Sequence, residues 1–97
     1  MNKEVQARIE TCQKEKAQEL DLSGLGLTKI PKAVGELVWL RRLDLSNNQI
    51  QTIQGLDQLS NITHLFLSNN QIQAIQGLDQ LSNITTLALQ NNQIQAI

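Results

Sequence analysis

Apolar and polar residues alternate in a repeating order along most of this chain. The pattern L-x-x-L-x-L-x-x-N-x-I, with Ile replacing its first Leu in two copies, occurs three times, as Leu40, Leu43, Leu45, Asn48 and Ile50; as Ile62, Leu65, Leu67, Asn70 and Ile72; and as Ile84, Leu87, Leu89, Asn92 and Ile94. Two leucines separated by one residue predict a short β-strand with one buried face. Because one such unit cannot bury its apolar face alone, we expect neighbouring units to stack on one core.

The last two units are almost identical copies. Residues 55–75 and 77–97 differ only at the pairs His64/Thr86, Phe66/Ala88 and Ser68/Gln90. These positions are two residues apart, so on a strand their side chains leave the same face. A chain that keeps its frame and varies one face resembles a binding scaffold.

The repeated leucines and asparagines predict the interior of the stack. We expect Leu43, Leu65 and Leu87 to form one buried column, and Leu45, Leu67 and Leu89 to form the next. The asparagines lie where the chain leaves each strand, so their amides are expected to satisfy buried backbone groups. The prediction is a structural asparagine ladder formed by Asn48, Asn70 and Asn92.

The residues before the first strand predict a covering helix. Val5, Ile9, Cys12 and Lys16 are spaced by four, three and four, which places the apolar members on one side of a helix from about Lys3 to Gln18. We therefore predict an N-terminal capping helix in residues 1–18 and repeats in residues 19–97, the last of them incomplete. Cys12 is the single cysteine, which excludes an internal disulfide and favours a buried structural thiol over a reactive one.

The three repeated patterns are identified as the leucine-rich repeat signature, and the resemblance extends from Leu20 to Ile97. The 22-residue spacing of the last units, from Leu43 to Leu65 to Leu87, is similar to the short class of the bacterial internalins. An earlier unit is degenerate, with Leu25 in place of the asparagine and a longer segment after Pro31. The resemblance implies an α/β repeat fold, a leucine-rich-repeat solenoid with about four parallel strands on its concave face.

The outward positions of those strands are the candidate binding site. Phe66 is the candidate anchor, because a covered aromatic residue can supply much of the energy of a protein interface. The alternative is that Phe66 only packs against its cross-strand neighbours. The predicted partner is a protein or peptide, and the predicted contact residues are Arg42, Asp44, His64, Phe66, Ser68, Thr86, Ala88 and Gln90.

Charge and motifs argue against other functions. The net charge is −1 and all eight Lys and Arg residues lie at or before Arg42, which leaves little for a nucleic-acid phosphate to bind. The first twenty residues contain no secretory or membrane-spanning hydrophobic stretch, so we expect a cytoplasmic protein that does not bind membranes. Phosphate-loop, H-E-x-x-H and C-x-x-C motifs are absent, so we expect no enzyme, cofactor or metal. A Ser46–His64–Asp44 relay on the open strand face is disfavoured, because it would lack oxyanion donors.

The C-terminal end leaves several alternatives open. No cap is recognisable there, so we expect one side of the last unit to expose Leu81, Ile84, Leu87, Leu89, Ile94 and Ile97. Either this end forms a homodimer, which makes the chain a self-assembling structural element, or the chain is a fragment of a longer array. The run from Glu19 to Pro31 also resembles the repeat region of bacterial Roco-type GTPases, whose nucleotide site would lie outside this chain. The near-identical copies fit both recent duplication and an engineered array.

Overall fold

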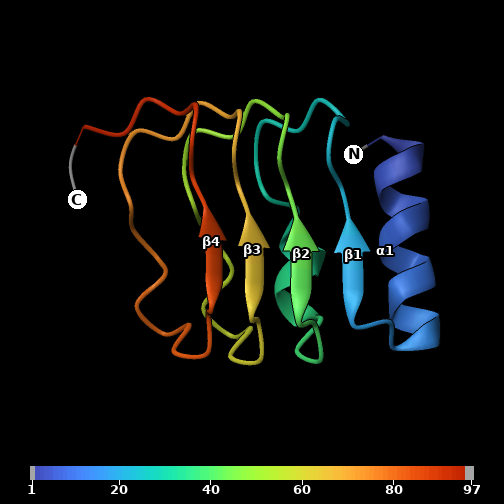
Figure 1. The fold of residues 1–97 in the computed structure, drawn as a ribbon. Helices are drawn as coiled ribbons and strands as arrows, with labels where there is room; N and C mark the ends of the chain where they lie inside the picture. Colours follow the sequence, from blue (N-terminus) through green and yellow to red (C-terminus); the bar gives the residue numbers. More distant parts are fainter. Residues whose placement is uncertain (1, 96–97) are drawn as a thin grey trace.

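Four short parallel strands form one sheet in the computed structural model, which describes residues 2–95. In Figure 1 they stand side by side in chain order as β1 (Glu19–Asp21), β2 (Arg42–Asp44), β3 (His64–Phe66) and β4 (Thr86–Ala88). The central leucines are in register, since Leu20 pairs with Leu43, Leu43 with Leu65, and Leu65 with Leu87. The predicted stack of parallel strands is confirmed.

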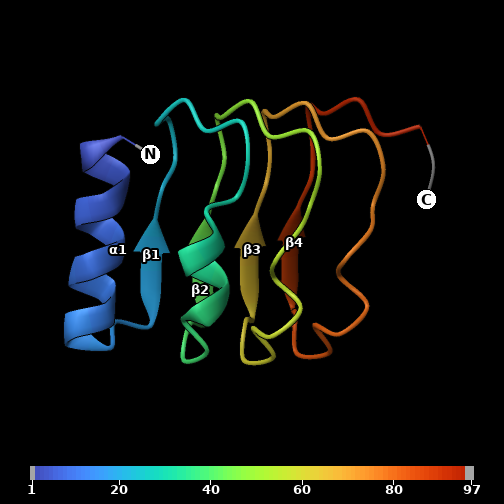
Figure 2. The same ribbon diagram turned by 180° about the vertical axis from the view of Figure 1, so that it is seen from behind.

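The chain returns behind the sheet between successive strands. The first return carries the 3₁₀ helix η1 (Lys32–Glu36), which lies behind β2 and buries Val34 (Figure 2). The later returns are formed by turns around Leu56, Leu59 and Leu81. The longer return after Pro31 therefore has a helical turn where the later copies have irregular backbone.

The interior follows the predicted leucine columns as far as β3. The side chains of Leu43, Leu65, Leu45 and Leu67 are completely buried. Leu87 is 39% exposed, so the prediction that it continues the buried column is wrong. The physical reason is that β4 is the edge strand of the sheet among residues 2–95, and one side of it has no neighbour.

The helix α1 (Lys3–Glu15) packs beside β1 at the N-terminal end of the stack (Figure 1). Its predicted apolar side is confirmed, because Val5, Ile9 and Cys12 are buried. The Asn2 side chain caps its first turn by accepting a hydrogen bond from the Val5 amide at 2.7 Å. The helix ends before the predicted Gln18, because Lys16 adopts the left-handed conformation with φ 52°.

Asparagine side chains join each unit to the one before it. The Asn70 amide donates to the carbonyl oxygens of Leu45 at 2.9 Å and Leu67 at 3.0 Å, and its oxygen accepts from the Ile50 amide at 3.0 Å. Asn48 and Asn92 make equivalent bonds one repeat before and one repeat after. These bonds reach polar backbone groups that the leucine core would otherwise leave unpaired.

The asparagine just before each ladder residue has a structural role of its own, which sequence reasoning missed. Asn47, Asn69 and Asn91 all have positive φ, between 58° and 63°, at the turn that follows each strand. Asparagine tolerates this left-handed region better than most residues. Gly24, with φ 67°, occupies the same position in the degenerate unit. The alignment of one glycine with three asparagines was therefore the sequence signal for this left-handed backbone conformation.

Candidate binding face

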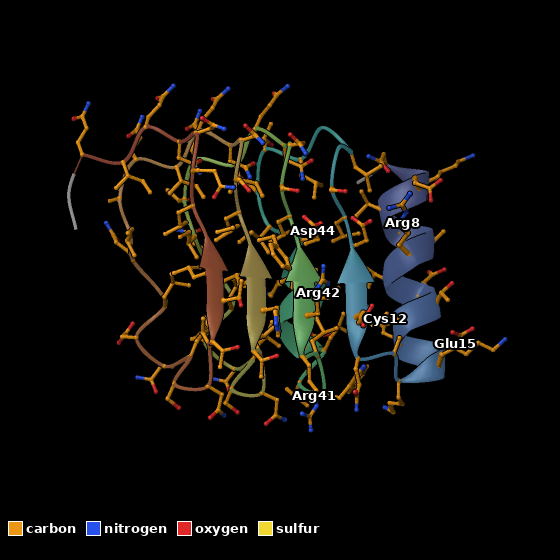
Figure 3. The ribbon with its side chains drawn as sticks, viewed as in Figure 1. Arg8, Cys12, Glu15, Arg41, Arg42 and Asp44 are labelled. Atoms are coloured by element: carbon orange, nitrogen blue, oxygen red, sulfur yellow. The ribbon has the colours of Figure 1, made fainter. Side chains whose placement is uncertain are left out.

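The outward residues of the strands form rows across the sheet. Glu19, Arg42, His64 and Thr86 are in register, and Asp21, Asp44, Phe66 and Ala88 form the next row. Arg42 and Asp44 project from β2 toward the viewer in Figure 3. The structure thus brings the predicted strand residues together on one face.

Phe66 lies at the centre of this face and is half-buried. The Arg42 guanidinium carbon lies 4.6 Å from the centre of the Phe66 ring, which is a cation–π contact, and the His64 ring centre is 6.4 Å away at 31°. On β4 the residue opposite Phe66 is Ala88, the smallest side chain of its row. The ring is therefore covered from β2 and flanked only by a methyl group on the β4 side.

Two aspartates of the face hold the turns that follow their strands. Asp44 accepts hydrogen bonds from the Ser46 amide at 2.9 Å and from the Ser46 hydroxyl at 2.6 Å, and Asp21 makes the same two bonds with Ser23. The hydroxyl and amide of Ser23 hold the pKa of the Asp21 carboxyl below its ordinary value.

His64 is hydrogen-bonded to Thr63 rather than to this aspartate–serine pair. Its Nδ1 lies 2.9 Å from the Thr63 hydroxyl, whereas Ser46 donates its own hydroxyl hydrogen to Asp44. The structure therefore pairs Ser46 with Asp44 and His64 with Thr63, which is not the arrangement of the disfavoured Ser46–His64–Asp44 relay.

Two residues predicted to be accessible are buried. Ser68 is 8% exposed and offers little surface to a partner, although Gln90 at the same position of the next unit is exposed. At the predicted self-association end, Leu81 is 5% exposed, so its predicted exposure is wrong: it packs into the main core. Ile84, Leu89 and Ile94 are half-buried against the same core, Leu87 is exposed, and Ile97 lies outside the described residues.

Two constant polar positions of the copied segment bond between repeats. Asn61 and Asn83 donate to Val38 and Ser60 of the preceding unit, and Thr63 and Thr85 donate to Arg41 and Thr63. Their constancy therefore has a structural cause. The two Asn-Ile-Thr stretches contribute these inter-repeat bonds on the side where the chain enters each strand.

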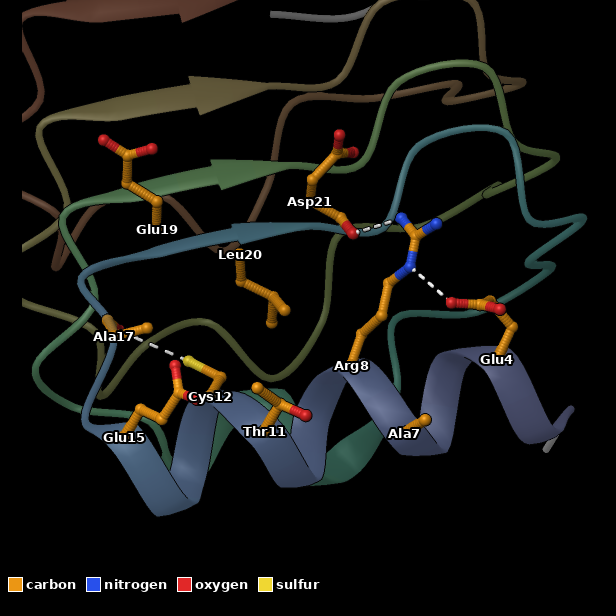
Figure 4. A pocket seen from close by; sticks show the side chains of 10 residues that line it. All are labelled: Glu4, Ala7, Arg8, Thr11, Cys12, Glu15, Ala17, Glu19, Leu20 and Asp21. Atoms are coloured by element: carbon orange, nitrogen blue, oxygen red, sulfur yellow. Dashed lines mark hydrogen bonds and ion pairs between the residues drawn. The ribbon is translucent and has the colours of Figure 1, made fainter.

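A hollow between α1 and β1 was missed by sequence reasoning. The volume of this hollow is about 480 Å³. Its lining residues are shown in Figure 4. Arg8 crosses it, and donates to the Glu4 carboxylate at 2.9 Å and to the Asp21 carbonyl at 2.8 Å. The heptad-like spacing of the helix indicated its buried side, but no local pattern showed which helix residues would face the strand.

Cys12 lies at the base of this hollow and is almost completely buried. Its thiol donates to the Ala17 carbonyl at 3.3 Å. Burial raises the pKa of the Cys12 thiol, and the nearby Trp39 indole partly offsets the rise. The thiol is therefore protonated at neutral pH.

Trp39 is half-buried against the core. The Lys16 Nζ lies above its ring, 4.1 Å from the ring centre, which places Trp39 between the helix and the repeats.

Neither a metal site nor a spanning helix is found in the described part of the chain. Residues 2–95 contain no group of three or more His, Cys, Asp or Glu side chains placed to hold a metal ion. In the same range, α1 is too short and too polar to cross a bilayer.

Parallel strands in register, one shared leucine core and an asparagine ladder define a solenoid repeat protein with a sheet on one face. A family model described as leucine rich repeat matches residues 15–72, and a second, described as leucine rich repeats in two copies, matches residues 60–97. The chain belongs to the leucine-rich repeat family.

Known structures share this fold. Internalin C2 of Listeria monocytogenes is similar over 86% of this chain and 36% of its own, with 34% identity and a TM-score of 0.79. A leucine-rich repeat protein of Leptospira interrogans is 36% identical over 90% of this chain and 23% of its own, with a TM-score of 0.79. The resemblance to short bacterial repeats is confirmed.

A plant protein matches a shorter stretch. Receptor-like protein 1 of Arabidopsis thaliana is 54% identical over 39 residues, which are 40% of this chain and 4% of that protein. The chain thus spans a small part of this relative and about a quarter to a third of the two bacterial structures. Leucine-rich repeat proteins generally mediate protein–protein interactions.

Proposed function

We propose that this chain is a noncatalytic module that binds a protein or peptide through the strand face. The observation that carries the proposal is Phe66, an aromatic ring in the middle of that face, half-buried under Arg42 and beside His64. A ring held in this way loses little freedom on binding, and a partner that covers it removes apolar surface from water.

The variation between the copied units supports the same face. His64 and Phe66 of β3 become Thr86 and Ala88 on β4, whereas residues that bond between repeats are kept. Four strands spaced by about 4.8 Å give a platform roughly 15 Å wide, which suits a short peptide or one helix.

Partner capture from a lysate of the source organism tests this proposal. The double variant His64→Thr, Phe66→Ala rewrites β3 as β4, so the fold is expected to persist, and it leaves the buried Ser68 unchanged. We expect the variant to lose a partner that the parent chain captures. A control variant, Gln51→Ala, Gln73→Ala, changes exposed residues away from the strands and should keep it. Equal capture by parent and double variant would contradict binding through this face.

Self-association through the β4 edge is a second candidate, favoured by the exposed Leu87. We propose that a second copy of the chain covers this leucine and the open side of β4, because exposed edge strands pair readily with other chains. Light scattering over a range of concentrations should show a dimer that Leu87→Lys reduces to a monomer. A parent chain that stays monomeric at high concentration would rule this out.

A further inference from the structure

The hollow beside α1 continues onto the strand face. A second hollow, over β1 and β2, is lined by Glu19, Leu20, Asp21, Arg42 and Asp44, and it shares the first three of these residues with the hollow of Figure 4. The two hollows therefore adjoin along β1 and together make one groove, which runs from the helix across β1 to Arg42 and Asp44 of β2. We call it the β1 groove.

The floor of the β1 groove is apolar and its rim is acidic. Ala7, Ala17 and Leu20 contribute carbon to the floor. The carboxylates around it are those of Glu4, Glu15, Glu19, Asp21 and Asp44, against the two guanidinium groups of Arg8 and Arg42. The floor of this groove is apolar, and its rim carries more carboxylates than guanidinium groups. Such a groove is suited to a side chain with a carbon stem and a cationic end.

The two arginines leave most of this negative charge uncompensated. Within residues 2–95 the one ion pair joins Arg8 to Glu4. Arg42 places its guanidinium over Phe66 and pairs with none of the carboxylates beside it. Bonds from Ser23, with smaller contributions from Arg8 and Arg42, lower the pKa of the Asp21 carboxyl. Glu19 and Asp21 are both exposed at the strand surface.

We propose that the β1 groove binds a basic side chain, Lys or Arg, of the same partner segment that covers Phe66. This inference rests on the proposed function and adds the chemistry of the partner. The basic side chain lies with its charge between Glu19 and Asp21, while an apolar side chain of the segment contacts Phe66. Charge complementarity selects a cationic segment over an acidic or neutral one.

The strand spacing gives the geometry of that segment. β1 and β3 are two strand spacings apart, about 10 Å. Two turns of a helix advance about 10.5 Å and return a side chain to the same face at i and i+7. An extended segment matches less well, because side chains on one of its faces are spaced by about 7 or 13 Å. The partner segment is therefore a helix with an apolar and a basic residue seven positions apart.

Two designed peptides test the proposal. Both are alanine-based helices of about 18 residues, long enough to form helix; one carries Leu and Lys at i and i+7, and the other carries Leu and Glu. Fluorescence anisotropy should show that the chain binds the lysine peptide about tenfold more tightly than the glutamate peptide, the effect of one or two exposed ion pairs.

Matched variants locate the charge that matters. Glu19→Gln, Asp21→Asn removes two carboxylates from the β1 groove, and asparagine retains the oxygen that accepts from Ser23. Asp57→Asn, Asp79→Asn makes the same change in net charge at exposed residues of the return segments. We expect about a tenfold loss of lysine-peptide affinity in the first variant and no loss in the second.

The outcomes separate this inference from the proposed function. Equal losses in the two variants, or no preference for the lysine peptide, would overturn the β1 groove as a basic-residue site while leaving Phe66-dependent partner capture untouched. Capture that does not depend on His64 and Phe66 would instead overturn the proposed function, and the peptide result would then report an isolated acidic groove. Circular dichroism of each variant checks that the fold is retained.

Discussion

Asn70 connects two repeats with one side chain, and its removal should be costly. Asn70→Ala leaves the Leu45 carbonyl and the Ile50 amide without this partner in a buried place. We expect a loss of about 1 to 3 kcal/mol in the free energy of unfolding, measured by urea denaturation. Asn92→Ala should cost less, because Asn92 is half-exposed and water can replace its bonds. Equal stability of parent and Asn70→Ala would contradict the ladder.

The carboxyl of Asp21 provides a test by pH. Its folded pKa is lowered from the ordinary 3.8 chiefly by the two bonds from Ser23. The stability that these bonds contribute is therefore present above about pH 4 and is lost as the pH falls through the lowered value. Carbon-detected NMR titration should find the Asp21 pKa below 3.8 in the parent and higher in Ser23→Ala. An unchanged titration in Ser23→Ala would assign the shift to another cause.

Cys12 should react slowly while the chain is folded. Cys12 is 2% exposed, so a reagent can hardly reach its thiol. Burial also raises the pKa of the thiol, so little of the reactive thiolate is present at neutral pH. We expect a thiol reagent such as Ellman's to label it only after unfolding, with labelling and urea unfolding midpoints that coincide. Rapid labelling of the native chain would show that α1 opens from β1.

At the scale of the elements, the return segments distinguish two glycines with similar backbones. Gly55 and Gly77 have φ of 83° and 75°, but an added Cβ at Gly77 would lie 2.8 Å from the Ile53 carbonyl oxygen, and at Gly55 it would meet nothing within 4 Å. Both alanine variants should lose about 1 to 2 kcal/mol from the left-handed conformation. Gly77→Ala should lose about 1 to 3 kcal/mol more in chemical denaturation, and equal losses would show that the chain relaxes around the new methyl group.

The strands and the helix could be predicted from the sequence, whereas the packing between them could not. Strand positions, their register and the buried side of α1 follow from the spacing of apolar residues, because a period of two and a period near 3.6 mark different structures. The burial of Ser68 and Leu81 depends on how neighbouring units pack, which a single unit does not encode. The β1 groove needed the placement of α1 against β1, and this is a tertiary contact between residues such as Arg8 and Asp21.

At the scale of the whole molecule, stability should grow by whole repeats. Each unit contacts mainly its neighbours, so a further copy of residues 54–75 inserted after Ile75 adds one unit and one interface. We expect a higher free energy of unfolding and a steeper dependence on urea. An insertion one residue shorter shifts the register between the new strand and its neighbours and should destabilise the fold. If both insertions behaved alike, the repeat would not be the unit of stability.

The asparagine amides all point toward the preceding unit: Asn48 to Leu22, Asn70 to Leu45 and Asn92 to Leu67. On the ribosome the N-terminal part of a chain emerges first, at about 5 to 20 residues per second. Each new repeat therefore completes hydrogen bonds on a surface that has already been synthesised. Translation and stacking run in the same direction, and a nascent chain gains structure with every unit that leaves the exit tunnel.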